Sequence, residues 1–558
     1  MGGYISKLRQ ALKWYMAFAM CHSLVKVLLA VWRTKRMMST LKHLPGAELD
    51  LKVEKYRANM SRLHDFKTEF HRQYPGAKLI RTHGPDPELM VLEPMFIKHF
   101  LKTEFDRNTK PSRDEDGLFD NLGEWLGEEG IFVIRHGTKV LPQDHAIWYT
   151  QRKTASKLFT RGNFQELMWQ AFAKKIDILV EVIDNAATSN KPIDIQEKFF
   201  SFTFDSIQKI FFDREVDSVS GKMDPYASAF DTAHREMMQF TIRTLPLYLL
   251  TKHVLPFPFG RLFPNSRHSG FLWPLYRMTN PYYQAFRCNV DYLHEETDKY
   301  VAAARASTPD VLESRHDLLA YFLKAEANGG QRIPDHRLRD IILNFIIAGR
   351  DTTACTLSWM FFYLATNPEV QEKAASEVRE VFGCRIPRLE ELTPDNAPYL
   401  HGVMYETLRL APPVPEDSKI VTQEMVFPDG THVLPGVRLG YMPYSMGRDP
   451  LTYEDPEAFR PERWVPFAPF AQDPDFQYKF PVFQSGNRVC LGASMAQFEA
   501  KMVAATLLGK FSFELAPDEK KDNYHYAFMI TMSVCNNREQ TSHQVNLSFK
   551  RRVNLNLQ

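Results

Sequence analysis

The residues of this 558-residue chain that are best suited to chemistry surround one cysteine near the C-terminus. The segment FQSGNRVCLG, residues 483–492, places a glycine four residues before Cys490 and another two residues after it, where the backbone can bend sharply. A basic residue stands two positions before the cysteine, and a helix-like run begins at residue 493. A cysteine near a cation and a helix N-terminus has a lowered pKa, so we expect a thiolate that binds a metal. The alternative is a buried structural thiol, the common fate of a single cysteine.

A second group of reactive side chains lies in the hexapeptide AGRDTT, residues 348–353. The residues before it, 341–347, are apolar almost all round and indicate a buried helix, where polar side chains are costly unless they are paired. Thr352 can donate back to the carbonyl four residues earlier and bend the helix, which would open a groove for water or O2. Asp351, Thr352 and Thr353 are then candidates for relaying protons to a reacting group. The alternative is a local kink with Asp351 and Thr352 facing solvent.

The element that must carry this hexapeptide is a helix predicted from Asp335 to Thr366, between Pro334 and Pro368. At 1.5 Å per residue it would be about 45 Å long and would cross a whole domain. Helical periodicity dominates from about residue 55 to residue 410, and a Pro-rich stretch with short strand-like runs follows. We therefore predict a mainly α protein with a small β region, folded as one large catalytic domain over residues 46–558.

Composition narrows the class of protein further. Apolar residues make up 44% of the chain and aromatic residues 13%, which is enough for a large core. The net charge of +2 gives no indication of a nucleic-acid partner. The six cysteines show no C-x-x-C spacing, which argues against a zinc site or a disulfide framework and favours a reducing compartment.

Residues 1–45 differ from the rest of the chain, because several basic residues and no acidic one occur there. From Trp14 to Trp32 the sequence is long and apolar enough to span a bilayer with tryptophans at its interfaces, although Lys26 lies within it. We predict an N-terminal membrane anchor and hinge. An amphipathic helix lying on the membrane and a mitochondrial presequence are the alternatives. The start of the chain also fits the template for N-myristoylation at Gly2.

The pattern F-x-x-G-x-R-x-C-x-G around Cys490 resembles the haem-binding loop of the cytochrome P450 family. Other motifs stand in that family's order. They are W-x-x-x-R at Trp148 and Arg152, the AGRDTT hexapeptide, E-x-x-R at Glu406 and Arg409, and a further arginine, Arg463. The resemblance covers essentially the whole chain after residue 45. It implies the cytochrome P450 fold, with a single large haem domain behind the membrane anchor.

This resemblance assigns roles to individual positions. Cys490 would be the thiolate ligand of the haem iron, while Thr352 and Asp351 would be the oxygen-activating threonine and its acidic neighbour. Glu406, Arg409 and Arg463 would form a structural triad that fixes the segment carrying the thiolate. The other positions expected at the haem, with Trp148 and the arginines directed to its propionates, are Phe483, Gly486, Arg488, Gly492, Trp148, Arg152, Ala348 and Gly349.

The family also implies a reaction and its partners. It implies a monooxygenase that inserts one oxygen atom from O2 into a C–H bond, with haem b as cofactor. Electrons would come from NADPH through a separate NADPH–cytochrome P450 reductase, with or without cytochrome b5. The expected place is the endoplasmic reticulum membrane with the catalytic domain in the cytosol, and a mitochondrial location is the alternative. Ala348 stands where animal fatty-acid ω-hydroxylases often carry a glutamate linked to haem, so we expect haem to be bound non-covalently.

Further strings narrow the resemblance to the fatty-acid and alkane ω-hydroxylases of plants and fungi. They are GIF at 130–132, FTFDSI at 202–207, LSW at 357–359 and FRPERW at 459–464. They imply hydroxylation of a long-chain fatty acid at or near its terminus. A sterol, terpenoid or other lipid substrate is the first alternative, and a haem-binding protein or an isomerase that needs no reductase is the second.

Two stretches depart from that pattern or stand outside it. Residues 135–143 look like an insertion beside the substrate-facing loop, and His145 replaces an expected glycine. The aromatic-rich stretch from Leu245 to Tyr276 falls near the family's access channel, where it would either dip into lipid or pack as ordinary core.

Overall fold

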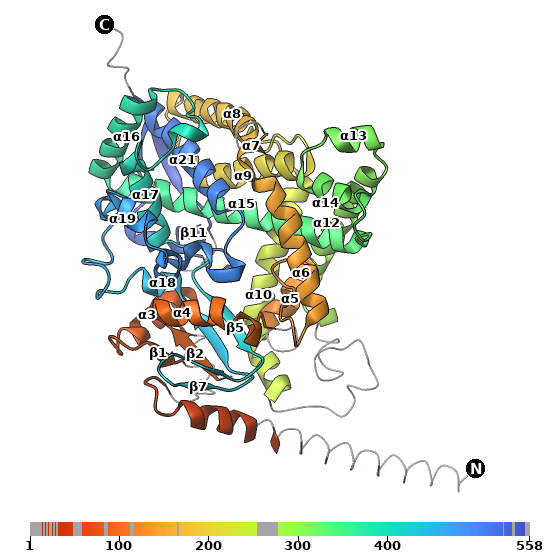
Figure 1. The fold of residues 1–558 in the computed structure, drawn as a ribbon. Coiled ribbons are helices and arrows are strands. Elements are labelled where there is room, and N and C mark those ends of the chain that lie inside the picture. Colours follow the sequence, from red (N-terminus) through yellow and green to blue (C-terminus); the bar gives the residue numbers. More distant parts are fainter. Residues whose placement is uncertain are drawn as a thin grey trace.

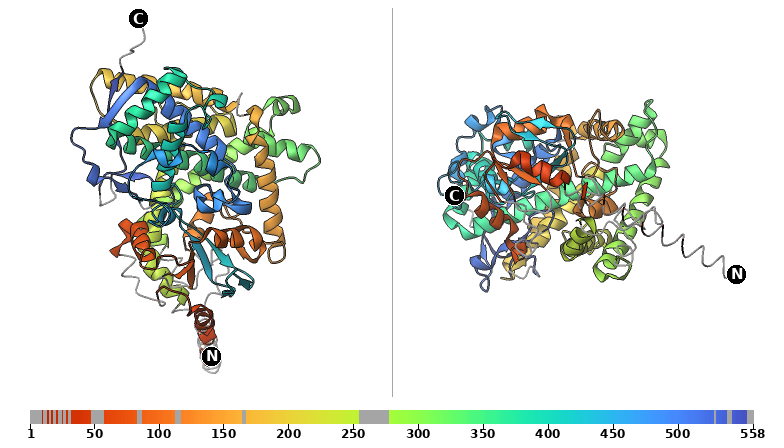
Figure 2. Two further views of the ribbon diagram at one scale, coloured as in Figure 1. Left: turned by 60° about the vertical axis from the view of Figure 1, so that its left-hand side comes forward. Right: turned by 90° about the horizontal axis from the view of Figure 1, so that it is seen from below.

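The structure is a computed structural model, and most of its residues lie in helices (Figure 1). It describes residues 32–47, 58–82, 87–111, 117–163, 167–253, 277–527, 529–537 and 542–552, with a few positions ahead of residue 32. A five-stranded sheet occupies the end of the molecule on which residues 41–47 pack, and helices fill most of the rest (Figures 1 and 2). The prediction of a mainly α protein with a small β region is confirmed.

The longest described helix, α15 (Asp335–Thr366), runs through the middle of the helical part (Figure 1). Its bounds are those predicted, since Pro334 caps its start and Asn367 and Pro368 follow its end. Gly349 permits close contact with a neighbouring helix, because a β-carbon there would lie 2.3 Å from Cδ1 of Ile207. The helices that pack most extensively on α15 are α9 (Ile195–Phe212), α12 (Pro281–Arg305), α17 (Pro398–Leu410) and α21 (Ala493–Lys510).

The other described helices pack around this group. α10 (Pro225–His253) lies against α12 and against α5 (Gly117–Leu126), and α16 (Pro368–Phe382) packs on α17 and α21. The remaining ones are α3 (Leu63–His71), α4 (Pro94–Lys98), α6 (Pro142–Ala155), α7 (Arg161–Asn163), α8 (Trp169–Thr188), α13 (Pro309–Ser314), α14 (Leu318–Ala327), α18 (Pro443–Met446), α19 (Ala468–Ala471) and α20 (Phe476–Lys479).

The five-stranded sheet has the order β1 (Leu79–Arg81), β2 (Glu88–Val91), β8 (Arg438–Tyr441), β5 (Asp417–Val421), β3 (Asn108–Thr109). Its β2–β8 pair is parallel and the other pairs are antiparallel. Because Thr109 lies opposite Ile420, the next residue, Lys110, comes close to the charged residues of β5. The smaller sheets are β4 (Ile193–Asp194) with β12 (Asn546–Arg551) and β9 (Phe511–Leu515), β6 (Met425–Val426) with β7 (His432–Val433), and β10 (His525–Tyr526) with β11 (Val534–Cys535).

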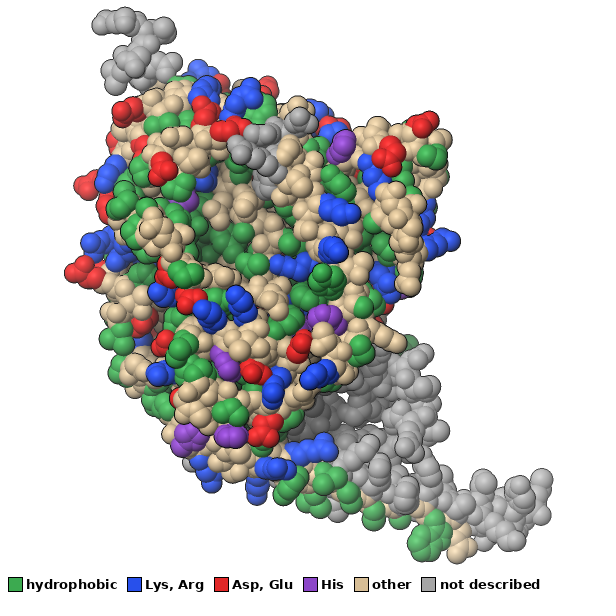
Figure 3. All heavy atoms as spheres, in the orientation of Figure 1, with side chains coloured by type: hydrophobic (Ala, Val, Ile, Leu, Met, Phe, Trp, Pro, Cys, Tyr) green, Lys and Arg blue, Asp and Glu red, His purple; other side chains and the backbone are tan. Residues whose placement is uncertain are grey.

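The segment that leads into the sheet is helical from residue 32 to residue 41. Leu41 and Leu44 are buried in the same core as the strand residues Leu79 and Leu89, and Ala47 N–H donates to the Arg81 carbonyl at 3.0 Å. Buried contacts thus begin ahead of the predicted boundary at residue 45. Further toward the N-terminus hydrophobic side chains are exposed (Figure 3), and those of Val25, Leu28, Leu29 and Trp32 are among them.

Most of the predicted membrane anchor, from Trp14 to Trp32, lies outside the described residues, and so does Gly2. Within the part of the chain that is described, no helix combines the length and hydrophobicity needed to cross a bilayer. The anchor therefore stays a prediction. Residues 254–276, which hold most of the aromatic-rich stretch, also lie outside the described residues.

Candidate active site

A cavity of about 230 Å³ lies between the middle of α15 and the Cys490 loop. Much of its wall is apolar, with Ile131, Phe132, Phe211 and Phe345 among the side chains that form it. Most residues predicted for the site meet at this cavity: Cys490, Phe483, Arg488, Gly492, Trp148, Arg152, Ala348, Gly349, Thr352 and Thr353. Asp351 and Gly486, which were predicted with them, are not among its lining residues.

The loop that carries Cys490 is held by its own backbone and by a close neighbour. The amide of Cys490 donates to the carbonyl of Phe483 at 2.8 Å, which closes the loop before α21 begins. Gly486 has φ of +65°, and a β-carbon there would lie 2.4 Å from the carbonyl oxygen of Leu101. Gly486 is thus required by the turn and by this contact, and it shapes the loop from outside the cavity.

The prediction of a lowered pKa for Cys490 is wrong when only the residues of the protein act on the thiol. Burial raises the pKa of the Cys490 thiol, and the Gly492 amide and the Arg152 guanidinium only partly oppose this effect. The nearby cation is therefore Arg152 on α6, while Arg488 turns its guanidinium toward the carbonyls of Ile131 and Ile134. A metal ion deprotonates a coordinating thiol outright, so metal binding would supply the thiolate that the loop alone does not favour.

On the opposite wall, Thr352 makes the bond expected for it. Its Oγ1 donates to the carbonyl of Ala348 at 2.7 Å, while α15 continues as helix through this position. A hydroxyl that has donated its one proton keeps its acceptor capacity, so Thr352 can accept a hydrogen bond from a group in the cavity. Thr353 and Thr356 also reach the cavity wall.

Asp351 points away from the cavity and is buried in a charged network that the sequence did not reveal. Its Oδ1 accepts from Arg350 Nη1 at 3.0 Å, and its Oδ2 lies 3.2 Å from Nδ1 of His234 on α10. Arg350 also pairs with Asp231 at 2.6 Å, and Asp231 is half exposed. Although burial acts to lower it, the carboxylates of Asp231 and Asp351 hold the pKa of Arg350 above its ordinary value.

Arg152 and Arg488, which the sequence predicts to bind the haem propionates, lie together at one edge of the cavity. Trp148 and Arg152 both point inward from α6, and the Arg488 guanidinium lies 4.8 Å from the centre of the Trp148 ring. Burial lowers the pKa of Arg488 to about 9, and burial also lowers the pKa of Arg152. Nε of Arg488 is buried and donates to no described partner. This edge therefore fits a ligand that carries acidic groups, as haem does.

Glu406, Arg409 and Arg463 form the predicted triad. Glu406 accepts from Arg409 Nη2 at 2.7 Å and from Arg463 Nε at 3.2 Å, and neither Glu406 nor Arg409 is exposed. The indole N–H of Trp464 also donates to Glu406, at 2.9 Å. Trp464 packs on Phe480, with ring centres 5.0 Å apart, directly before the Cys490 loop. The triad thus reaches the loop through aromatic packing.

A polar residue that sequence reasoning missed fixes the GIF string, residues 130–132, at the cavity wall. Asn344, in the otherwise apolar run of α15, donates to the carbonyls of Leu126 and Asp340 at 2.7 Å each, and its Oδ1 accepts from the Phe132 amide at 2.9 Å. A β-carbon on Gly130 would lie 1.9 Å from Nδ2 of Asn344. The lone asparagine in an apolar helix was the signal that could have found this contact.

Two further charged residues at the cavity were also missed. Lys110 follows β3, and burial lowers the pKa of its ammonium to about 7. Glu499 on α21 has both carboxylate oxygens buried with no described hydrogen-bond partner, and burial raises its pKa well above the usual range. Lys110 comes near the site only through the fold, whereas Glu499 lies on α21, which begins directly after the Cys490 loop.

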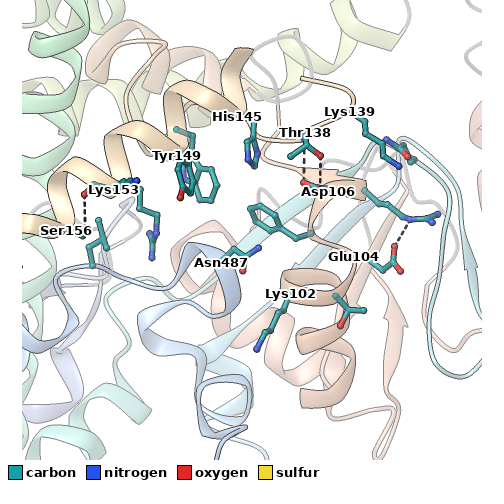
Figure 4. A pocket seen from close by; sticks show the side chains of 17 residues that line it. Lys102, Glu104, Asp106, Thr138, Lys139, His145, Tyr149, Lys153, Ser156 and Asn487 are labelled. Carbon is teal, nitrogen blue, oxygen red and sulfur yellow. Dashed lines mark hydrogen bonds and ion pairs between the residues drawn. The ribbon is translucent and has the colours of Figure 1, made fainter. Parts of the chain in front are cut away.

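A second and larger hollow, of about 780 Å³, lies beside α6, which directs His145, Tyr149 and Lys153 into it (Figure 4). Lys102, Lys139 and Lys153 line it with His145 and Asn487, and Asp106 bonds there to Thr138 in the stretch predicted to be an insertion. Trp148, Arg152 and Leu491 line both hollows, so the second hollow adjoins the cavity at Cys490 at these side chains.

Comparisons with known proteins agree with the geometry. A family model for cytochrome P450 matches residues 54–537. Cytochrome P450 704C1 of Pinus taeda is 29% identical over 505 residues, which cover 85% of this chain and 87% of the relative. Cytochrome P450 CYP94D108 of Paris polyphylla is 31% identical over 458 residues, covering 79% and 82%. Cytochrome P450 86B1 of Arabidopsis thaliana is 29% identical over 450 residues, covering 77% and 73%.

The first prediction concerns the triad. Glu406→Gln leaves the fully buried Arg409 without its carboxylate, and breaking a buried ion pair costs about 3–5 kcal/mol. We expect the free energy of unfolding, measured with urea, to fall by that amount. Glu514→Gln, in an exposed pair with Lys550, is the control and should change it by less than about 1 kcal/mol. Equal stability of the two variants would contradict the assigned role.

The second prediction concerns Asn344. Asn344→Leu is close in size but leaves the Phe132 amide without its acceptor, and a buried unsatisfied group costs about 1–3 kcal/mol. We expect faster amide hydrogen exchange in residues 126–134 while the rest of the domain stays protected. Asn289→Leu on α12 is the matched control, since Asn289 bonds only within its own helix. Unchanged exchange in the loop would show that Asn344 does not hold it.

Proposed function

The chain belongs to the cytochrome P450 family of monooxygenases, and on that premise we propose that it is a haem-thiolate enzyme that hydroxylates a long-chain fatty acid at or near its terminus. One observation carries the proposal: Cys490 and Thr352 line the same cavity from opposite walls, and Trp148, Arg152 and Arg488 line its edge. A thiol, a hydroxyl acceptor and two arginines without an ion pair among the described residues would suit a haem, which needs a thiolate ligand, space for O2 and partners for its propionates.

The proposed cofactor is haem b, held without a covalent link to the chain. Cys490 would bind its iron, Phe483, Gly486 and Gly492 would shape the loop beneath it, and Ala348 and Gly349 would face it from α15. Bound there, haem b would supply the activation of O2 and the insertion of one oxygen atom into a C–H bond. Ala348 carries no side chain able to form an ester, which supports non-covalent binding.

The chain's own contribution to this reaction is the control of protons. Thr352 keeps its acceptor capacity toward the cavity because its proton is given to the Ala348 carbonyl. Asp351 would supply protons to that position, with Thr353 beside it, as a general acid does. Arg350 and His234 hold the Asp351 carboxylate away from the cavity, so delivery requires one of these contacts to open.

The proposed substrate is a long-chain fatty acid. The apolar wall formed by Ile131, Phe132, Phe211 and Phe345 suits an alkyl chain, and a chain is bound by the burial of its methylene groups. The resemblance of the GIF and FRPERW strings to plant and fungal ω-hydroxylases favours hydroxylation at or near the chain end. A sterol or terpenoid is the second candidate, since an apolar wall accepts rings as well.

The proposed setting follows from the family and from the N-terminal sequence. Electrons would come from NADPH through a separate cytochrome P450 reductase, with or without cytochrome b5. The exposed hydrophobic side chains ahead of residue 33 support attachment to a membrane, proposed to be the endoplasmic reticulum with the catalytic domain in the cytosol. A mitochondrial membrane is the alternative.

The third prediction tests the thiolate. The ferrous protein with bound CO should show the red-shifted absorption band of thiolate ligation, and Cys490→Ser should abolish that band because a serine oxygen is a poor substitute for the thiolate. Cys384→Ser, the same substitution at another free cysteine, should leave the band in place. A wild-type protein that binds haem without the red-shifted band would sink the proposed function.

The fourth prediction tests the substrate. Saturated fatty acids, n-alkanes and sterols should be added separately to the haem-loaded protein, and the spin state of its haem followed by absorption. We expect fatty acids to shift it, since they displace water from the apolar cavity, and we expect hydroxylation near the chain end with NADPH and reductase. A shift with sterols alone would replace the fatty-acid proposal by the second candidate. Product formation that needs no reductase would instead indicate an isomerase.

A further inference from the structure

Gln484, which follows Phe483 in the loop that carries Cys490, has a backbone conformation that suits glycine. Its φ is +62° and its ψ is −175°. A residue with a β-carbon is strained in this region, which only glycine enters freely. Such strain persists only where the surrounding structure requires the conformation, so the contacts of Gln484 must offset it.

Hydrogen bonds hold the backbone on both sides of Gln484. The carbonyl of Phe483 accepts from the Cys490 amide at 2.8 Å. The amide of the same peptide bond, that of Gln484, donates to the carbonyl three residues earlier at 3.1 Å. Beyond the turn, the Gly486 amide donates to Oε1 of Gln477 at 3.2 Å. Gln484 joins these two fixed parts, so a relaxation of its backbone would move the carbonyl that is bonded to the Cys490 amide.

The side chain of Gln484 is bonded to a tyrosine of the five-stranded sheet. Its Oε1 accepts from the hydroxyl of Tyr441 on β8, and Tyr441 is fully buried. Oδ2 of Asp417 lies 3.4 Å from the same hydroxyl. Asp417, however, already accepts from Lys419 and from the Ser418 amide. Since a tyrosine hydroxyl has one proton to give, that proton goes to Gln484.

Glycine in place of Gln484 would remove the strain, but it would remove this bond as well. Glycine would also give the loop more conformations, because its backbone is the least restricted. The bond to Tyr441 has the opposite effect, since a hydrogen bond fixes both the distance and the direction between its two groups. It therefore restricts the peptide between Phe483 and Gln484, and through that peptide it restricts the position of Cys490.

We propose that Gln484 is a positioning residue for Cys490, and that its bond to Tyr441 holds the loop in the conformation in which Cys490 lines the cavity. The inference rests on the proposed function, because that function makes the sulfur a haem ligand. It adds a residue that the motif F-x-x-G-x-R-x-C-x-G leaves variable, and a partner on the sheet that lies 43 residues earlier in the chain.

The test uses three variants of the haem-loaded, full-length protein. Tyr441→Phe removes only the hydroxyl, Gln484→Ala removes the bond but keeps the β-carbon, and Gln484→Gly removes the bond and the strain. Tyr478→Phe is the matched control, because the buried hydroxyl of Tyr478 has no partner among the described residues. Two rates are measured in dilute urea. The first is the conversion of the red-shifted CO band to an unshifted band, and the second is unfolding followed by far-UV circular dichroism.

We expect Tyr441→Phe to lose the red-shifted band about fivefold faster than wild type, as the loss of one hydrogen bond of ordinary net strength predicts, while the unfolding rate changes by less than about twofold. Gln484→Ala should lose the band at least as fast. Gln484→Gly should lose it more slowly than Gln484→Ala, because glycine relieves the strain. When Gln484→Gly is already present, adding Tyr441→Phe should change the rate by less than about twofold, since the hydroxyl has lost its partner. Tyr478→Phe should not speed the conversion.

Three results would overturn the proposal: band loss from Tyr441→Phe at the wild-type rate, the same effect of Tyr441→Phe with and without Gln484→Gly, or band loss that only keeps pace with unfolding. Equal rates for Gln484→Ala and Gln484→Gly would overturn the role of strain. If Gln484→Ala does not load haem, Gln484→Met, which keeps the length of the side chain, is measured in its place. Failure of this proposal is distinguishable from failure of the proposed function, because the red-shifted CO band of the wild-type protein tests the thiolate without any change at Gln484.

Discussion

The arrangement of the site depends on one buried carboxylate, Glu406. Removing a carboxylate from water costs several kcal/mol, which only close ion pairing and several good hydrogen bonds offset. Glu406 accepts from two nitrogens of Arg409, from Arg463, from the indole of Trp464 and from the amide of Arg460. Every one of these donors belongs either to α17 or to residues 460–464, so satisfying the carboxylate fixes those two segments against each other.

That constraint reaches the cysteine through packing. Tyr405 on α17 and Trp464 both contact Phe480, with ring centres 5.7 and 5.0 Å apart. Phe480 leads directly into the Cys490 loop, whose own closure is the bond from the Cys490 amide to Phe483. The sulfur thus takes its position from an ion pair that never touches the cavity. The opposite wall is α15, a single unbroken helix, so both walls are set by rigid elements.

Local sequence signals predicted the parts of this site that depend on local spacing. Helical geometry accounts for the Glu406–Arg409 pair on one helix face and for the inward direction of Trp148 and Arg152. It also accounts for the bounds of α15 and for the hydrogen bond from Thr352 to the carbonyl four residues earlier. The contact of Asp351 with His234 joins segments more than a hundred residues apart, and the placement of Lys110 depends on strand pairing. No motif encodes either of these features. The raised pKa of Cys490 was missed because burial outweighs nearby charge, and burial is a property of the fold.

The loop from Gly130 to Ile134 joins the two halves of the site. Its carbonyls at Ile131 and Ile134 accept from Arg488, and the carbonyl of Phe132 accepts from Lys110, while Asn344 holds the Phe132 amide from α15. Ile131 and Phe132, which line the cavity, are therefore held through their carbonyls by the same cations that would meet a haem. Any group that draws Arg488 or Lys110 toward itself must pull on the same backbone that positions Ile131 and Phe132. Haem binding would therefore be coupled to the shape of this cavity through the carbonyl bonds, without any movement of α15 or of the Glu406 triad.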